Sequence, residues 1–196
     1  MASRGNSRAR NEIIELLKDD HRRVKKAFKA AQKMDPEEDA EDLQALVDET
    51  LDDLEIHARL EEELFYPAAR ESLKDENLIE EAEVEHASAK MLIAQLRGMT
   101  PDDPKYMATF KVLGEYVQHH VKEEENELFE QLSSGRSKVR WEELQQQMLT
   151  MRETLLVEMG YGEVEMEDEE EEASTPSRGR GRSRSERSAD AEETVD

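Results

Sequence analysis

The sequence predicts an all-α protein, an up-and-down four-helix bundle followed by an additional C-terminal helix and a disordered tail. Charged residues make up 39% and hydrophobic residues 36% of the 196 residues, a composition typical of helices with a narrow apolar stripe. Apolar residues also recur in steps of three and four along five segments, which is the spacing of residues on one face of a helix.

Stretches of turn-forming and helix-ending residues separate the five segments. They are "MDPEEDAED" after residue 33, "LKDEN" after residue 72, "GMTPDDP" from Gly98 and "SSGRS" from Ser133. We therefore expect four consecutive parts, with these bounds: a flexible N-terminus at 1–9, the four-helix bundle at 10–132, a C-terminal amphipathic helix at 138–160 and a disordered tail at 161–196.

Each of the four longer segments carries an inward-facing stripe that contains one histidine. In the second and fourth segments a glutamate follows that histidine after one helical turn. The stripes are Ile14, Leu17, His21, Val24, Phe28 and Ala31; Leu43, Val47, Thr50, Leu54, His57, Glu61, Leu64 and Ala68; Leu78, Ala82, His86, Ala89, Ile93 and Leu96; and Phe110, Leu113, Val117, His120, Glu124 and Leu128. Of the five histidines, His119 alone lies off a stripe.

The fifth segment has an apolar stripe without a histidine, and the tail has no apolar stripe. Trp141, Leu144, Met148, Met151 and Leu155 repeat the apolar rhythm without a histidine, as expected for a covering helix. The tail is an acidic block followed by a Ser/Arg-rich stretch with almost nothing apolar to bury, which predicts disorder. Its arginines could contact nucleic acid or an acidic protein partner, although the acidic flanks compete for them.

Charge and cysteine content exclude several classes of function. A formal net charge of −23 repels phosphate backbones and anionic lipid surfaces, which argues against nucleic acid and membranes as partners. The absence of cysteine rules out disulfides and thiolate ligands, so any metal must bind nitrogen and oxygen atoms. The N-terminal residues resemble no signal sequence and no segment has membrane-spanning length, so we expect a cytoplasmic protein.

The polar residues of the stripes are expected to meet in one layer of the bundle. At 1.5 Å per residue, His21 and His57 lie roughly 24 and 30 Å from the turn near residue 37. His86 and His120 lie roughly 23 and 28 Å from the turn near residue 101. An uncompensated buried imidazole or carboxylate costs several kcal/mol, whereas a whole domain is stable by only about 5–15 kcal/mol. These residues therefore require compensation.

A pair of metal ions would provide this compensation. Hydrogen bonds between histidine and glutamate one turn apart could do part of it. Imidazoles and carboxylates are also ligands of iron, manganese and zinc, and two carboxylates can bridge two cations. The sequence thus predicts two hairpins, each giving one histidine from its first helix and a His-x-x-x-Glu pair from its second. The predicted metal ligands are His21, His57, Glu61, His86, His120 and Glu124.

Four motifs resemble the ligand-bearing helices of the hemerythrin-like, HHE cation-binding family. They are, in order, "DDHRRV", "HARLEEELFYP", "EVEHASAKML" and "YVQHHVKEEENELF", within roughly residues 10 to 132. The resemblance implies a four-helix bundle holding two iron ions in a non-haem di-iron site, with manganese or zinc as alternatives. It implies that the four stripe histidines bind iron and that Glu61 and Glu124 bridge the two metals.

The sequence departs from this pattern at two places. Lys90 stands where oxygen-carrying hemerythrins have a second histidine of the third helix, so one iron either has an additional open position or takes Glu83 as a ligand. The doubled histidine near residue 120 also allows two other pairs, His119 with Glu123 and His120 with Glu125. The phase of the fourth stripe favours His120 with Glu124, with the neighbouring glutamates as surface charges.

We expect a protein that binds or senses O2, or a related small oxidant such as peroxide or NO, at an open iron coordination position. The sequence leaves open whether the protein is an enzyme, since it has no flavin- or nicotinamide-binding glycine motif. A di-iron peroxidase or oxidase is one alternative, although a ferritin-like oxidase needs two Glu-x-x-His motifs and only Glu83 with His86 faces inward. The other alternative is a metal-free acidic helical scaffold, with a protein partner for the tail.

Overall fold

The computed structural model describes residues 2–73, 76–134 and 138–161. All regular elements within these ranges are helical, which confirms the predicted fold class. The α-helices are α1 (Ala2–Ala31), α2 (Ala40–Leu60), α3 (Tyr66–Arg70), α4 (Asn77–Leu96), α5 (Tyr106–Glu123), α6 (Phe129–Ser134) and α7 (Trp141–Glu158), and the π-helical segments are η1 (Glu61–Phe65) and η2 (Glu124–Leu128).

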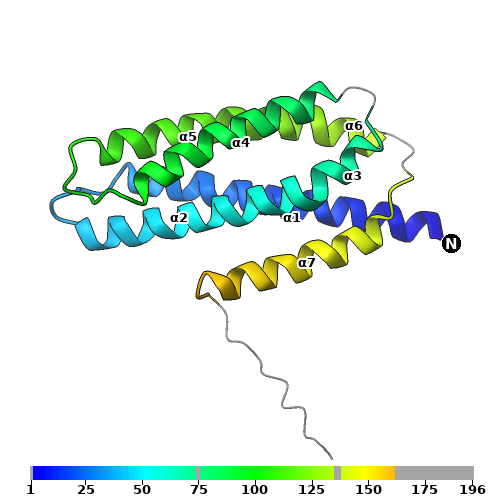
Figure 1. Cartoon of the computed structure of the whole chain (residues 1–196), viewed down its shortest axis with the longest axis horizontal. Coiled ribbons are helices and arrows are strands. Elements are labelled where there is room, and N and C mark those ends of the chain that lie inside the picture. The colour runs from blue at the N-terminus through cyan, green and yellow to red at the C-terminus, as the bar shows by residue number, and fades with distance from the viewer. Residues whose placement is uncertain (1, 74–75, 135–137, 162–196) are drawn as a thin grey trace, which may run out of the picture. The chain divides into compact units, whose positions relative to one another are not determined.

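Four helical rods form the bundle, and α7 packs on its outside. The rods are α1, α2 with its extension through η1 and α3, α4, and α5 with its extension through η2 and α6. The first two rods pair as one hairpin and the last two as a second hairpin, while α1 also contacts α5 and α2 contacts α4 (Figure 1). Helix α7 lies against α1 and α2. None of the described helices is long and apolar enough to span a membrane.

Aspartates close the turns inside the two hairpins. The backbone N–H of Asp35 donates to the side chain of Asp39 at 2.9 Å, just before α2 begins. In the other turn the N–H of Thr100 donates to the carboxylate of Asp103 at 2.8 Å. These bonds satisfy backbone donors that have left a helix, so the Asp- and Pro-rich stretches of the sequence end the helices at these points.

The first helix is longer than the sequence indicates. It begins at Ala2 and thus includes most of residues 1–9, for which the sequence suggested a flexible segment. Asn6 holds this extension: its Nδ2 donates to the carbonyl of Val139 at 2.9 Å, and its Oδ1 accepts from the N–H of Trp141 at 2.6 Å. Apolar periodicity cannot reveal a helix that is held by polar contacts to a distant segment. The predicted disordered tail lies outside the described residues, apart from its first residue.

A polar layer divides the apolar core into two clusters. Ile13, Leu17 and Trp141 belong to the cluster on one side, and Val24 and Phe28 to the cluster on the other. Between them lie buried polar side chains from all four rods. The polar layer, as we call it below, consists of the core histidines His21, His57, His86 and His120 and the core glutamates Glu61 and Glu124.

The π-helical segments shift the phase of the apolar stripe beyond the polar layer. The sequence predicts Leu64 and Ala68 as inward-facing, but these residues are half-buried, whereas Phe65 and Ala69 have no exposed surface. A π-turn inserts one extra residue into the helical repeat, so the buried face moves forward by one position after Glu61. A constant period of 3.6 residues could not predict this shift.

Gly114 allows close packing of α5 against Phe28, so Gly114→Ala should destabilise the bundle. A Cβ atom at this position would lie 2.9 Å from Cδ1 of Phe28, a buried ring that packs on Phe110 at a centroid distance of 4.7 Å. The loss of stability from overpacking, about 1–3 kcal/mol, should exceed the stabilisation of about 1 kcal/mol that alanine gains over glycine from helix propensity. Chemical denaturation should show a net loss of about 1 kcal/mol.

The double variant Phe28→Leu/Gly114→Ala is the control for this prediction. Its loss of stability should be smaller than the sum of the two single losses, because the smaller side chain leaves room for the new methyl group. If the Gly114→Ala chain is as stable as the wild type, the helices can move apart without loss of stability, and the prediction is wrong.

Candidate metal centre

The six predicted ligands meet in the polar layer. Each residue has no more than 6% of its surface exposed, although the six come from four separate rods. One group of atoms close enough to hold a metal ion comes from His21, His57, Glu61 and Glu124. A second group comes from His86, His120 and, again, Glu61. Helical rise and stripe phase thus predicted the convergence of these side chains.

The core histidines form two pairs, one from each hairpin. Nε2 of His21 lies 3.2 Å from Nε2 of His57, and Nε2 of His86 lies 3.1 Å from Nε2 of His120. All four Nε2 atoms are therefore directed into the layer. Two imidazole nitrogens so close together can share a proton or face a common cation.

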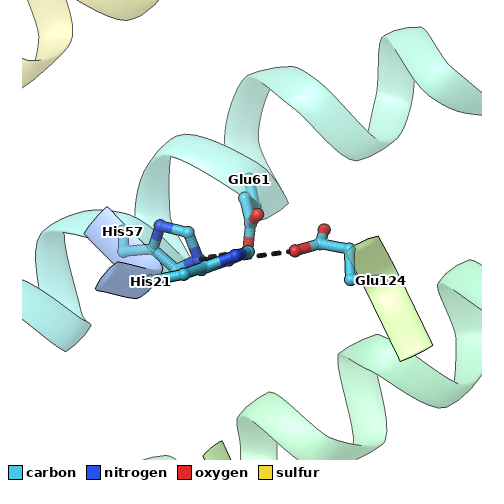
Figure 2. A group of neighbouring side chains, drawn as sticks. All are labelled: His21, His57, Glu61 and Glu124. Carbon is cyan, nitrogen blue, oxygen red and sulfur yellow. Dashed lines mark hydrogen bonds and ion pairs between the residues drawn. The ribbon is translucent and has the colours of Figure 1, made fainter. Parts of the chain in front are cut away.

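Each core glutamate contacts both histidine pairs. Oε2 of Glu61 is 3.2 Å from Nε2 of His57 and 3.4 Å from Nε2 of His86. Oε2 of Glu124 is 3.2 Å from Nε2 of His21 and 3.9 Å from Nε2 of His120. Figure 2 shows Glu61 and Glu124 approaching the first pair from two different rods. Both carboxylates thus lie where a bridge between two cations would be.

Both core glutamates begin a π-helical segment. Glu61 is the first residue of η1 and Glu124 is the first residue of η2, and each follows a core histidine by four residues. Single π-turns are uncommon and occur often at functional sites. The apolar periodicity did not indicate these turns, although the repeated "LF" at residues 64–65 and 128–129 marks the matching place in both hairpins.

A carboxylate lies behind every core histidine. The distances from Nδ1 to the nearest carboxylate oxygen are 2.9 Å for His21 and Glu125, 3.0 Å for His86 and Glu62, 3.0 Å for His120 and Glu85, and 3.5 Å for His57 and Asp20. A carboxylate at one ring nitrogen fixes the orientation of the imidazole and leaves the other nitrogen free to bind metal. This arrangement is typical of histidines that serve as metal ligands.

These four carboxylates were not predicted from the sequence. Asp20 and Glu85 directly precede a core histidine, and Glu62 and Glu125 directly follow a core glutamate. Each contacts a histidine of a neighbouring rod rather than of its own. Glu125, for which the sequence suggested surface charge, is half-buried against His21. Their positions next to predicted ligands were the only sign of this role in the sequence. Which histidine each carboxylate contacts depends on how the four rods pack.

The hydroxyl group of Tyr66 completes the layer. This fully buried side chain donates a hydrogen bond to Oε2 of Glu61 at 3.2 Å. Burial raises the pKa of Tyr66 well above its ordinary value, and the charges of Glu124 and Glu61 raise it further. The phenol therefore stays protonated and remains a donor to Glu61.

The metal-free layer holds protons and unsatisfied acceptors. Burial lowers the pKa of His57, but the nearby Glu61 and Asp20 carboxylates outweigh it and raise that pKa well above its ordinary value. The pKa of His21 is lowered, mainly by burial. Oε1 of Glu61 and Oε1 of Glu124 accept no hydrogen bond from any described residue. Cations between the histidine pairs would satisfy these oxygens, so the donor set fits divalent metals.

The alternative ligands considered from the sequence lie outside the layer. Glu83 is exposed and accepts a hydrogen bond from Arg70 at 2.9 Å. Lys90 is exposed and contacts Glu62, the carboxylate behind one core histidine. The side chain of His119 is 59% exposed, whereas His120 is buried. The geometry therefore favours the original six residues.

A small cavity adjoins the polar layer. Its volume is about 40 Å³, enough for a molecule of the size of water or a diatomic gas. The cavity borders the core histidines, and its apolar walls include Val24, Leu54, Ile93 and Val117. A neutral small ligand could therefore reach the histidines without losing contact with apolar surface.

Helix α7 is connected to the layer through Asp20. Both oxygens of this buried carboxylate accept hydrogen bonds from Arg152 of α7, at 2.6 and 2.9 Å, and one oxygen also contacts Arg23. Burial raises the pKa of Asp20, but the contacts to His57 and Arg152 outweigh it, so that the pKa is lower than usual. Asp20 thus stays ionised behind His57.

The fold and the polar layer define a helix bundle with an internal histidine and carboxylate site, an arrangement in which bundles hold metal ions. The sequence profile of the hemerythrin HHE cation binding domain matches residues 12–132. The chain belongs to this family, which confirms the resemblance of the four motifs.

Two individual proteins are also similar to this chain. A hemerythrin HHE cation binding domain-containing protein from Mycobacterium kansasii has a crystal structure that superposes with a TM-score of 0.61 at 24% identity, covering 76% of this chain and 93% of that one. This likeness shows the shared fold. A DNA nickase from Nostoc sp. is 28% identical over 127 residues, which are 65% of this chain and 35% of that protein. The chain spans about a third of the length of this relative, since the aligned share is 35%.

Removal of the Arg152 guanidinium should destabilise the chain through Asp20. Arg152→Gln leaves a buried carboxylate with fewer donors, at an expected cost of about 1–3 kcal/mol at pH 7. Because the folded pKa of Asp20 is lowered, the stabilisation is present above its unfolded pKa and is lost as the pH falls toward the folded value. The deficit should therefore shrink in acid, as measured by denaturation at pH 7 and pH 3.

Arg140→Gln, at the residue directly before α7, is the matched control. Arg140 pairs with Glu143 at 2.7 Å on the surface, where such pairs contribute roughly 0–1 kcal/mol. Equal effects of the two substitutions, or a deficit of Arg152→Gln that does not change with pH, would contradict the role of Asp20.

Proposed function

We propose that the chain is a non-haem di-iron protein that binds or senses O2 or a related small oxidant such as peroxide or NO. The observation that carries this proposal is the pair of buried glutamates that each contact both histidine pairs. The proposed ligands are His21, His57, Glu61, His86, His120 and Glu124. Bound iron would supply a change of oxidation state and an affinity for small oxidants that side chains lack.

The residues around the layer suit this function. The carboxylates behind the core histidines hold the rings in place and increase their basicity as ligands. The two core glutamates bring negative charge that offsets part of the charge of two divalent cations. The hydroxyl of Tyr66 donates a hydrogen bond to Glu61 and helps to hold its carboxylate in place.

The apolar cavity favours a small neutral ligand over a charged or bulky one. Its walls offer dispersion contacts, while the surrounding core limits the entry of water and of larger substrates. The alternatives of a di-iron peroxidase or oxidase use the same site and differ in consuming the oxidant over many turnovers. A cytoplasmic location and a protein partner for the tail stay predictions.

Metal analysis of the full-length chain, purified anaerobically, tests the proposal. We expect two iron ions per chain and a change in the optical spectrum on addition of O2, peroxide or NO. Steady consumption of the oxidant in the presence of a reductant would favour the enzymatic alternative. Protein that retains no stoichiometric metal would instead favour the metal-free scaffold.

Removal of metal should lower the stability of the chain. Metal that binds the folded state alone adds its binding free energy to folding, on the order of 3 kcal/mol at a free concentration 100 times the Kd. Chelation should therefore lower the Tm of the wild type by several degrees. His57→Ala should also lower the Tm, and chelation should then have less effect on the variant. Equal effects of chelation on both proteins would contradict binding by His57.

Metal binding should release protons near neutral pH. The raised pKa of His57 keeps this residue protonated at pH 7 in the metal-free chain, and a metal ligand must be deprotonated. Titration calorimetry in two buffers with different ionisation heats should reveal proton release on metal binding, and affinity should rise with pH. Binding without proton release would show that His57 is not a ligand.

A further inference from the structure

Three surface side chains form a separate group behind one core histidine. Glu85 of α4 and His119 and Glu123 of α5 place one potential ligand atom each within 4.8 Å of one another. Nε2 of His119 is 3.6 Å from Glu85 and 3.3 Å from Glu123. One imidazole and two carboxylates are suitable donors for a divalent transition metal.

The equivalent face of the first hairpin is closed. The two hairpins match through their core residues, so corresponding positions are Asp20 with Glu85, Ile56 with His119 and Leu60 with Glu123. Ile56 and Leu60 are buried in the apolar cluster that includes residues of α7. Asp20 is neutralised by Arg152 from the same helix. The first hairpin therefore has an apolar surface and a fixed cation at this place.

The second hairpin has neither of these features. Within the described part of the chain, no lysine or arginine lies at ion-pair distance from Glu85 or Glu123, whose contacts are with His119 and His120. A divalent cation would therefore neutralise Glu85, as Arg152 neutralises Asp20. The exposure of His119 allows such a cation to arrive from solvent.

A small pocket of about 10 Å³ borders both the polar layer and two residues of this group, Glu85 and Glu123, with Leu78, Ala82 and Leu128 also in its wall. Glu81, Glu85 and Glu123 line it near the surface, and His120 and Glu124 line it in the core. Glu124 is 3% exposed; its Oε1 accepts no hydrogen bond from a described residue, whereas its Oε2 lies 3.2 Å from Nε2 of His21. The carboxylates at the outer end of this pocket attract cations, and Oε1 of Glu124 is a free acceptor at its inner end.

We propose that Glu85, His119 and Glu123 form a divalent-cation entry site that delivers metal through this pocket to Glu124 and His120. The inference rests on the proposed function, because an entry site requires a core that takes up metal. It assigns a role to the histidine outside the polar layer and to the face that α7 does not cover.

The rate of metal uptake tests this inference. Metal-free full-length chain is mixed with Co²⁺, and retained metal is measured over time after a chelating resin has removed weakly bound ions. The variant His119→Gln/Glu123→Gln should load about tenfold more slowly than the wild type, because the acidic entry no longer concentrates the cation. Its final metal content should equal that of the wild type, since the polar layer is unchanged.

Glu127→Gln is the matched control, because it removes one negative charge from an exposed position of η2, four residues after Glu123. It should load at the wild-type rate. Equal rates for the double variant and this control would overturn the entry site. A lower final content in the double variant would also overturn it, since these residues would then belong to the retained centre. Wild-type chain that retains no Co²⁺ would overturn the proposed function itself.

Discussion

The structure depends on compensation of a buried polar layer. Four imidazoles and two carboxylates occupy one level of a bundle that is apolar on both sides. Leaving them unpaired would cost more than the stability of a domain of this size. The fold meets this constraint by directing every Nε2 inward, placing a carboxylate behind every ring and inserting two π-turns that begin at the core glutamates. Metal ions at the centre would complete this arrangement.

The near-symmetry of the two hairpins makes their differences informative. Both give the same sequence of groups to the layer, but α7 packs mainly against α1 and α2 of the first hairpin and neutralises Asp20 with Arg152. At the matching place the second hairpin has Glu85 beside an exposed histidine. The first half thus has a fixed cation at this place, and the second half has an exposed imidazole.

Periodicity in the sequence was sufficient for the bundle and for the convergence of the six residues, because stripe phase and helical rise fix which side chains face inward and at what depth. It failed where another interaction overrides a constant period. The π-turn moved burial from Leu64 to Phe65, and Asn6 extended α1 through contacts with a distant segment. The carboxylates behind the histidines were also missed, because Asp20 and its counterparts serve neighbouring rods and their partners are set by packing.

The central claim is that two cations organise the polar layer. Anomalous diffraction at the iron edge from crystals of the iron-loaded chain measures this most directly. The account predicts two anomalous peaks, one beside His21 and His57 and the other beside His86 and His120, with Glu61 and Glu124 adjoining both. Iron found elsewhere, or a layer held together by hydrogen bonds among its own side chains with no peak between them, would contradict it.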